Sequence, residues 1–140
     1  MEQLLHYVWK HKIYPIRGMK TTAGEAVEVV DPGLQNHHAG PDFFNAKLKI
    51  GGVLWVGNVE VHEKASHWYS HGHHLNPAYA NVILHVVGEA DTDVTRYGSS
   101  EIIPQMIVDA EVLTHFDISF KIIQMHLRIK AEVKIAESVG

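Results

Sequence analysis

The chain has 140 residues, a formal net charge of -4, twelve histidines and no cysteine. This length suits a single domain, and the lack of cysteine excludes disulfides, thiolate nucleophiles and cysteine zinc sites. The pI of about 6.3 argues against a global basic field, so nucleic-acid binding would need a local basic patch. The N-terminus does not resemble a signal peptide and no apolar run approaches the ~20 residues of a membrane span, which predicts a cytoplasmic protein with no membrane partner.

The first predicted elements are a helix and a strand. Apolar residues at helical spacing predict a short amphipathic helix over residues 2–12. A brief β-rich run at Val27–Val30 predicts a strand, which Asp31-Pro32-Gly33 ends. Residues 34–41 are rich in polar residues, glycine and proline, and predict an ordered loop.

A long β-hairpin follows. Apolar and polar residues alternate over Phe44–Ile50, as in a half-buried strand. Gly51-Gly52 predicts a two-residue turn, because glycine accepts the positive φ that such turns require. The return strand then runs from Val53 to about His62, and its side chains alternate between the two faces.

The second half predicts a short helix, two strands and a tail. A short helix is expected around Trp68, and Trp55 and Trp68 are expected in the core or at its rim. After a polar loop over residues 71–77, the unbroken apolar run Val82–Val87 predicts a central buried strand. Residues 102–108 predict a strand at the sheet edge, since they contain a proline.

These elements predict an α/β fold with a mixed sheet and flanking helices. The core of the fold would follow the order helix, strand, hairpin, helix, strand. Residues 1–110 are expected to form one core domain. Residues 111–140 are expected to form a helical or irregular tail, which would begin a further region of a longer protein.

Polar residues gather on one face of the return strand. Asn58, Glu60 and His62 alternate along it and must project from the same side. Two interpretations stay open. The face is either exposed to solvent, as polar strand faces usually are, or it forms a functional site with the acid at the start of the first strand, Asp42.

Several uncommon sequence motifs occur in the same order as in a known protein family. Gly40-Pro41-Asp42-Phe43-Phe44-Asn45, Gly57-Asn58-Val59-Glu60-Val61-His62 and Asn81-Val82-Ile83-Leu84-His85 are similar to the domain-of-unknown-function family 2851 of bacteria. The resemblance covers about residues 4 to 110. Since members of that family are generally much longer, it implies an N-terminal piece, but it implies no activity.

A more distant resemblance implies a catalytic activity. The strand order and the Pro41-Asp42 … Glu60-Val61-His62 pattern resemble the PD-(D/E)xK nuclease superfamily, where a helix precedes three strands, a helix and a further strand. It implies a restriction-endonuclease-like fold and a metal-dependent phosphodiesterase that acts on nucleic acid. Asp42, Glu60 and the Val61 carbonyl would bind Mg²⁺ or Mn²⁺. His62 replaces the lysine of the pattern, and histidine is charged only if its pKa is raised.

The hairpin register decides whether the two acids can meet. A regular turn at Gly51-Gly52 would place Asp42 opposite Val61, on the face away from Glu60. A β-bulge or a bend at Pro41-Asp42 would restore convergence. The same register places Asn45 and Lys47 on the face of Glu60, so Lys47 is either a relocated lysine of the site or an exposed charge.

The histidines offer a rival site. A metal such as Zn²⁺ could be bound by histidines of the loop together with His62 and His85, which would make the protein a histidine-bound zinc hydrolase, although no familiar zinc spacing is present. The loop histidines are His67, His71, His73 and His74. His85 is alternatively a buried histidine that is hydrogen-bonded to a neighbour. Asp31 is either a turn former or a further ligand. A third interpretation is a non-catalytic binding or scaffold module with a degenerate nuclease fold.

Overall fold

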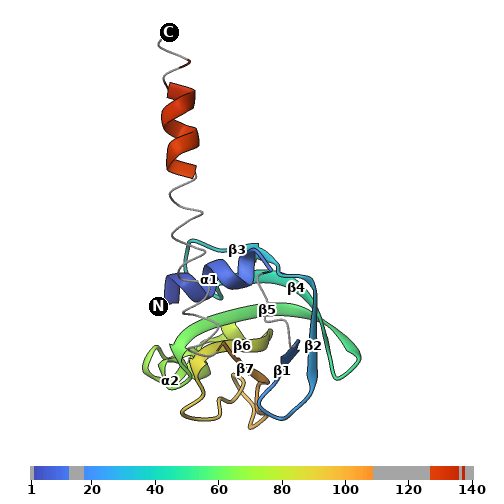
Figure 1. Ribbon diagram of the computed structural model, residues 1–140. Coiled ribbons are helices and arrows are strands. Elements are labelled where there is room, and N and C mark those ends of the chain that lie inside the picture. Colours follow the sequence, from blue (N-terminus) through green and yellow to red (C-terminus); the bar gives the residue numbers. More distant parts are fainter. Residues whose placement is uncertain (1, 13–17, 109–126, 136, 138–140) are drawn as a thin grey trace.

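A mixed β-sheet dominates the computed structural model, which describes residues 2–12, 18–108, 127–135 and 137 (Figure 1). Within these residues seven strands form one sheet in the order β1-β2-β4-β5-β6-β7, and β3 pairs with β4. The β5–β6 and β6–β7 pairs are parallel and the others are antiparallel, which confirms the predicted mixed sheet. The strands are β1 (Met19–Lys20), β2 (Ala26–Asp31), β3 (Leu34–Gln35), β4 (Phe43–Ile50), β5 (Val53–Lys64), β6 (Val82–Glu89) and β7 (Gln105–Ile107).

The β4–β5 hairpin contains a bulge. Gly51 and Gly52 form the predicted turn with φ of 59° and 82°. The pairing is regular from Ile50↔Val53 to Ala46↔Gly57, then shifts, so that Phe43 pairs with Val59. The regular register was therefore wrong and the bulge is confirmed, although it lies between Phe43 and Ala46 and not at Pro41-Asp42. Because of this shift the start of β4 lies beside Glu60.

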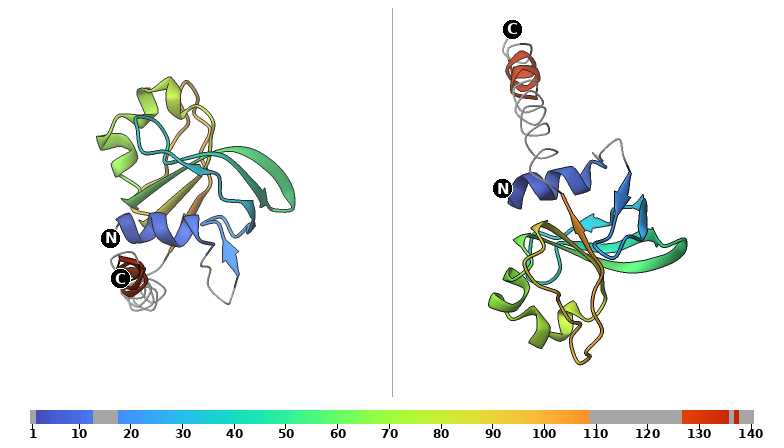
Figure 2. Two further views of the ribbon diagram at one scale, coloured as in Figure 1. Left: turned by 90° about the horizontal axis from the view of Figure 1, so that it is seen from above. Right: turned by 60° about the horizontal axis from the view of Figure 1, so that its bottom comes forward.

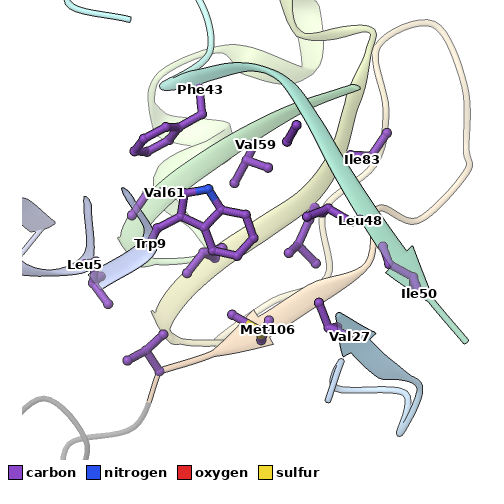
Figure 3. Close-up of a cluster of buried hydrophobic side chains, with 14 residues drawn as sticks. Leu5, Trp9, Val27, Phe43, Leu48, Ile50, Val59, Val61, Ile83 and Met106 are labelled. Atoms are coloured by element: carbon purple, nitrogen blue, oxygen red, sulfur yellow. The ribbon is translucent and has the colours of Figure 1, made fainter. Parts of the chain in front are cut away.

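Helix α1 (Glu2–Lys10) covers one face of the sheet. Its apolar residues recur at helical spacing, so Leu5, Val8 and Trp9 are all buried. Leu5 and Trp9 pack against side chains of β4, β5 and β6 (Figure 3). The Trp9 indole N–H also donates to the Pro32 carbonyl at 2.9 Å, which ties α1 to the turn after β2.

The connection between β5 and β6 covers the opposite face (Figure 2). Two parallel neighbours require a crossover, and here it contains α2 (His67–Ser70) and the 3-10 turns η1 (His73–Leu75) and η2 (Pro77–Tyr79). Trp68 and Tyr79 pack there in a second core cluster with Val82 and Val87. With both faces covered, the polar side chains of the inner half of β5 are buried.

The outer half of the hairpin is exposed, which corrects one prediction. Trp55 is 48% exposed and does not belong to the core, whereas Trp68 is fully buried as expected. The hairpin extends past the elements that cover the sheet (Figure 1), and Val53, Leu54 and Val56 are exposed with Trp55. Alternation along a strand defines its faces but does not show how far a covering layer reaches.

The remaining sequence predictions differ from the structure only in detail. The first helix ends at Lys10, and the loop predicted over residues 34–41 begins with the two-residue strand β3. Strand β6 is central and almost wholly buried, and β7 lies at the sheet edge directly after Pro104, both as predicted. Of the predicted tail, residues 111–126 lie outside the described part, while residues 127–135 are helical with exposed side chains. None of the described helices is long and apolar enough to cross a membrane.

Candidate functional site

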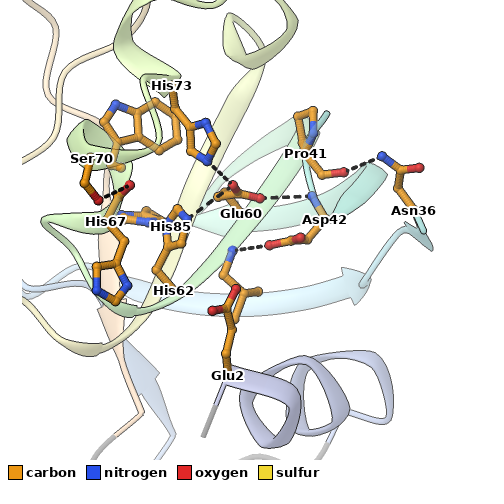
Figure 4. A network of polar contacts seen from close by, with 12 residues as sticks. Glu2, Asn36, Pro41, Asp42, Glu60, His62, His67, Ser70, His73 and His85 are labelled. Atoms are coloured by element: carbon orange, nitrogen blue, oxygen red, sulfur yellow. Dashed lines mark hydrogen bonds and ion pairs between the residues drawn. The ribbon is translucent and has the colours of Figure 1, made fainter. Parts of the chain in front are cut away.

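Glu60 is the centre of a buried polar network (Figure 4). It is only 3% exposed. One carboxylate oxygen, Oε2, lies 2.7 Å from His73 Nε2 and 3.6 Å from His62 Nε2. The other oxygen, Oε1, accepts a hydrogen bond from the backbone N–H of Asp42 at 3.1 Å. One carboxyl group thus joins the start of β4 to the histidines above β5.

Asp42 completes a reciprocal pair of bonds with β5. Its Oδ2 accepts from the backbone N–H of Val61 at 2.8 Å, while its own N–H donates to Glu60. The same oxygen lies 3.5 Å from His6 Nε2 on α1, and His6, Glu2 and Asp42 form one group whose ligand atoms lie within 4.8 Å of one another. The bulge therefore brings Asp42 to Glu60, as the metal-site hypothesis requires, and also to α1.

Three histidines converge beside Glu60. Ligand nitrogens of His62, His71 and His73 lie within 4.8 Å of one another. His62 comes from β5, His71 directly follows α2, and His73 is the first residue of η1. Gly72 has a φ of 71°, a left-handed conformation that ends α2 and turns the chain between His71 and His73. The chain thus places His71 and His73 next to His62 of β5.

A chain of hydrogen bonds lies behind His62. Its Nδ1 is 2.7 Å from Nε2 of His85, and Nδ1 of His85 is 2.8 Å from Oε1 of Gln105. The Gln105 amide donates to the Thr92 carbonyl at 2.9 Å. His85 is fully buried, so its interpretation as a buried histidine that is hydrogen-bonded to a neighbour is confirmed.

Burial sets the charge of these groups. It lowers the pKa of His62 to about 2 and of His73 to about 4, with further lowering by neighbouring histidines. It raises the pKa of Glu60, and the neighbouring Asp42 raises it further. The ring of Tyr79 stacks on His73. Burial raises the pKa of Tyr79 to about 12, and the nearby Glu60 and Asp42 contribute to this rise. Near neutral pH the imidazoles of His62 and His73 are therefore neutral, which is the form that binds metals.

Other predicted residues lie around this centre. Asn58 accepts a hydrogen bond from the backbone N–H of Asn45 at 3.3 Å, so both residues hold the bulge. Lys47 is exposed. It pairs with Val56 and Asp31, so it lies nearer to the hairpin turn than Glu60 does. Asp31 accepts from the Gly33 N–H at 2.8 Å, which confirms its turn-forming role. The ligand roles of Asp42, Glu60 and the Val61 carbonyl remain predictions.

Sequence reasoning missed four residues of the network: Glu2, His6, Tyr79 and Gln105. Three of them carried a signal in the sequence. Glu2 and His6 are one helical turn apart on α1, and Gln105 is a polar residue within the otherwise apolar strand segment 102–108. A polar residue in a buried strand needs a partner, so Gln105 pointed to a buried hydrogen bond.

One comparison with known proteins gives a match. The family model described as "Protein of unknown function (DUF2851)" matches residues 2–136. The chain belongs to the DUF2851 family. The DUF2851 match runs past the limit near residue 110 that the sequence resemblance predicted, so the tail also falls within the family region. Neither the curated proteins nor the solved structures contain a match to this chain.

Proposed function

We propose that this DUF2851 chain is a metal-dependent hydrolase that cleaves phosphodiester bonds in nucleic acid, with its metal bound beside Glu60. The observation that carries the proposal is the position of Glu60 Oε2, which is buried and lies 2.7 and 3.6 Å from two imidazole nitrogens. Convergence of titratable groups with shifted pKa values at one buried point is typical of functional sites.

The donor set indicates a transition metal. Imidazole nitrogens suit Zn²⁺ and related ions, whereas Mg²⁺ prefers oxygen ligands. His62, His71 and His73 supply three nitrogens, and Glu60 supplies a carboxylate beside them. In the metal-free chain Glu60 and His73 share a hydrogen-bonding proton, and metal binding would displace that proton. A bound metal would supply an activated water near neutral pH, and Glu60 would accept the proton of that water.

The substrate class rests on the order of the elements. Helix α1 precedes the antiparallel strands β2, β4 and β5, and α2 then leads to the parallel strand β6. This order fits the PD-(D/E)xK pattern, with Asp42 at the start of the second core strand and Glu60 on the third. It supports a restriction-endonuclease-like fold, in which Asp42, Glu60 and the Val61 carbonyl would bind Mg²⁺ or Mn²⁺.

A histidine-bound zinc hydrolase with a substrate other than nucleic acid is the second candidate. The grouping of His62, His71 and His73 favours it, because three protein ligands with an open fourth position are typical of catalytic zinc sites. Cleavage tests and metal preference separate the two candidates.

The test is metal-dependent cleavage of fluorescent DNA and RNA by the metal-stripped chain after addition of Mg²⁺, Mn²⁺ or Zn²⁺. Glu60→Gln should lower the rate by about 10²-fold or more, because the general base is lost. The exposed His37→Asn is the matched control and should leave the rate unchanged.

Two further variants identify the metal site. Loss of activity in His71→Asn but not in Asp42→Asn would support the histidine site, and the opposite result would support the Asp42–Glu60 site. If a folded wild-type chain cleaves neither nucleic acid with any of these metals, the nuclease proposal is wrong. Cleavage of a non-nucleic-acid ester that depends on Zn²⁺ and His71 would then support the zinc hydrolase, and binding without cleavage would support the scaffold module.

A further inference from the structure

The hydrogen-bond chain behind His62 has a defined direction. A backbone carbonyl can only accept, so the Gln105 side chain must present its NH₂ group to the Thr92 carbonyl and its Oε1 to His85. Because Oε1 also only accepts, Nδ1 of His85 must carry a hydrogen. A neutral His85 then has an unprotonated Nε2.

This direction extends to His62. The unprotonated Nε2 of His85 accepts at 2.7 Å, so Nδ1 of His62 carries the hydrogen of that contact. The lone pair of His62 is therefore on Nε2, the nitrogen that lies 3.6 Å from Glu60 Oε2. His62 thus presents its lone pair to the candidate metal centre without a change of tautomer.

The fold buries this arrangement and sets its register. His62, His85 and Gln105 are 2%, 0% and 2% exposed, so water does not compete for their hydrogen bonds. His85 and Gln105 are direct partners in the parallel β6–β7 register. The Trp68 ring also lies edge-on to His85, with ring centroids 5.3 Å apart. The short strand β7 thereby places one amide group against one imidazole.

We propose that Gln105 and His85 are positioning residues of the metal centre, which fix His62 as the Nδ1–H tautomer and direct its Nε2 lone pair to the metal. This inference rests on the proposed function for the identity of the ligand, but the tautomer itself is a property of the metal-free chain. A histidine ligand whose second nitrogen donates to a fixed acceptor is oriented and made more basic by that acceptor.

The first test is long-range ¹H–¹⁵N NMR of the histidine rings in the metal-free wild-type chain. The expected result is a neutral His62 with its hydrogen on Nδ1, and the same tautomer for His85. A His62 ring with its hydrogen on Nε2 would overturn the proposal, whether or not the chain binds metal.

The second test is metal affinity, measured by competition with a chromophoric chelator for Zn²⁺ and Mn²⁺. Gln105→Met keeps a similar side-chain volume but removes the acceptor, and it should weaken metal binding by about 10- to 100-fold. Gln35→Met, on β3, is the matched control and should bind as the wild-type chain does.

The two tests separate the inference from the proposed function. If the wild-type chain binds no metal, the proposed metal centre fails, and the NMR result alone decides the tautomer. If Gln105→Met keeps both the wild-type His62 tautomer and the wild-type affinity, the positioning role is wrong. If that variant does not fold, the wild-type tautomer measurement still decides.

Discussion

The buried network predicts that the metal-free chain is most stable near the ordinary histidine pKa. Burial lowers the pKa of His62, His73 and His85 far below 6.5, and it raises the pKa of Glu60 far above 4.5. In the folded chain these groups are therefore neutral over a pH range in which the unfolded chain carries their charges. Each such difference makes the free energy of unfolding depend on pH.

The sign follows from the direction of each shift. The lowered histidine pKa values stabilise the fold fully above 6.5, and this contribution is lost as pH falls toward about 4 for His73 and His85 and about 2 for His62. The raised Glu60 pKa stabilises the fold below 4.5, and this contribution is lost as pH rises. Each group changes the free energy of unfolding by about 1.4 kcal/mol per pH unit. Between 4.5 and 6.5 the three imidazoles outweigh the single carboxyl, and above 6.5 Glu60 is the one group of these four that still changes the stability.

The assay is urea denaturation with a chelator present, repeated from about pH 5 to about pH 8.5. We expect a maximum near pH 6.5, a fall of about 2.7 kcal/mol per pH unit on the acid side and a fall of about 1.4 kcal/mol per pH unit on the alkaline side. Glu60→Gln should remove the fall on the alkaline side, while His37→Asn should leave the curve unchanged. A wild-type free energy of unfolding that is level or still rising above 6.5 would refute the reasoning, and so would an alkaline fall that persists in Glu60→Gln.

Three further predictions concern the scaffold. Trp68→Ala should lower the free energy of unfolding by about 3–5 kcal/mol because the ring is fully buried, whereas Trp55→Ala, at a position that is 48% exposed, should change it by less than about 1 kcal/mol in the same urea titration. Gly57→Ala should cost about 1–3 kcal/mol, since an added Cβ would lie 2.5 Å from the Ile83 side chain, and an unchanged thermal midpoint would contradict this. Asn45→Gly should be tolerated but Asn45→Val should destabilise the bulge, because Asn45 has a φ of 58°; equal thermal midpoints for the two variants would count against the strain argument.

Much of the sheet could be predicted because its patterns are local. Alternation over Phe44–Ile50, the turn at Gly51-Gly52 and the apolar run at Val82–Val87 each specify an element without reference to the rest of the chain. The faces of β5 follow from the same rule, so Asn58, Glu60 and His62 could be grouped from the sequence alone.

The bulge was harder to place because it depends on a conformation and a distant partner. Asn45 adopts a left-handed conformation, which asparagine tolerates better than most residues, and its N–H bonds to Asn58 on the neighbouring strand. Neither fact is visible in the alternation of Phe44–Ile50. The sequence therefore showed that a bulge was needed to bring Asp42 to Glu60, but it did not show which residue would form it.

The burial of the polar face depends on the crossover, and this is the point at which the interpretation changes. A solvent-exposed Glu60 would cost nothing and would need no explanation. Once α2 and the two 3-10 turns cover it, every polar group on that face costs desolvation energy unless it is paired. Apolar residues of similar volume often stabilise a fold as well as or better than a buried ionic cluster does. The fold could thus be achieved more simply without Glu60, His62 and His85, and this supports the proposal that Glu60 and His62 face a metal while His85 positions His62.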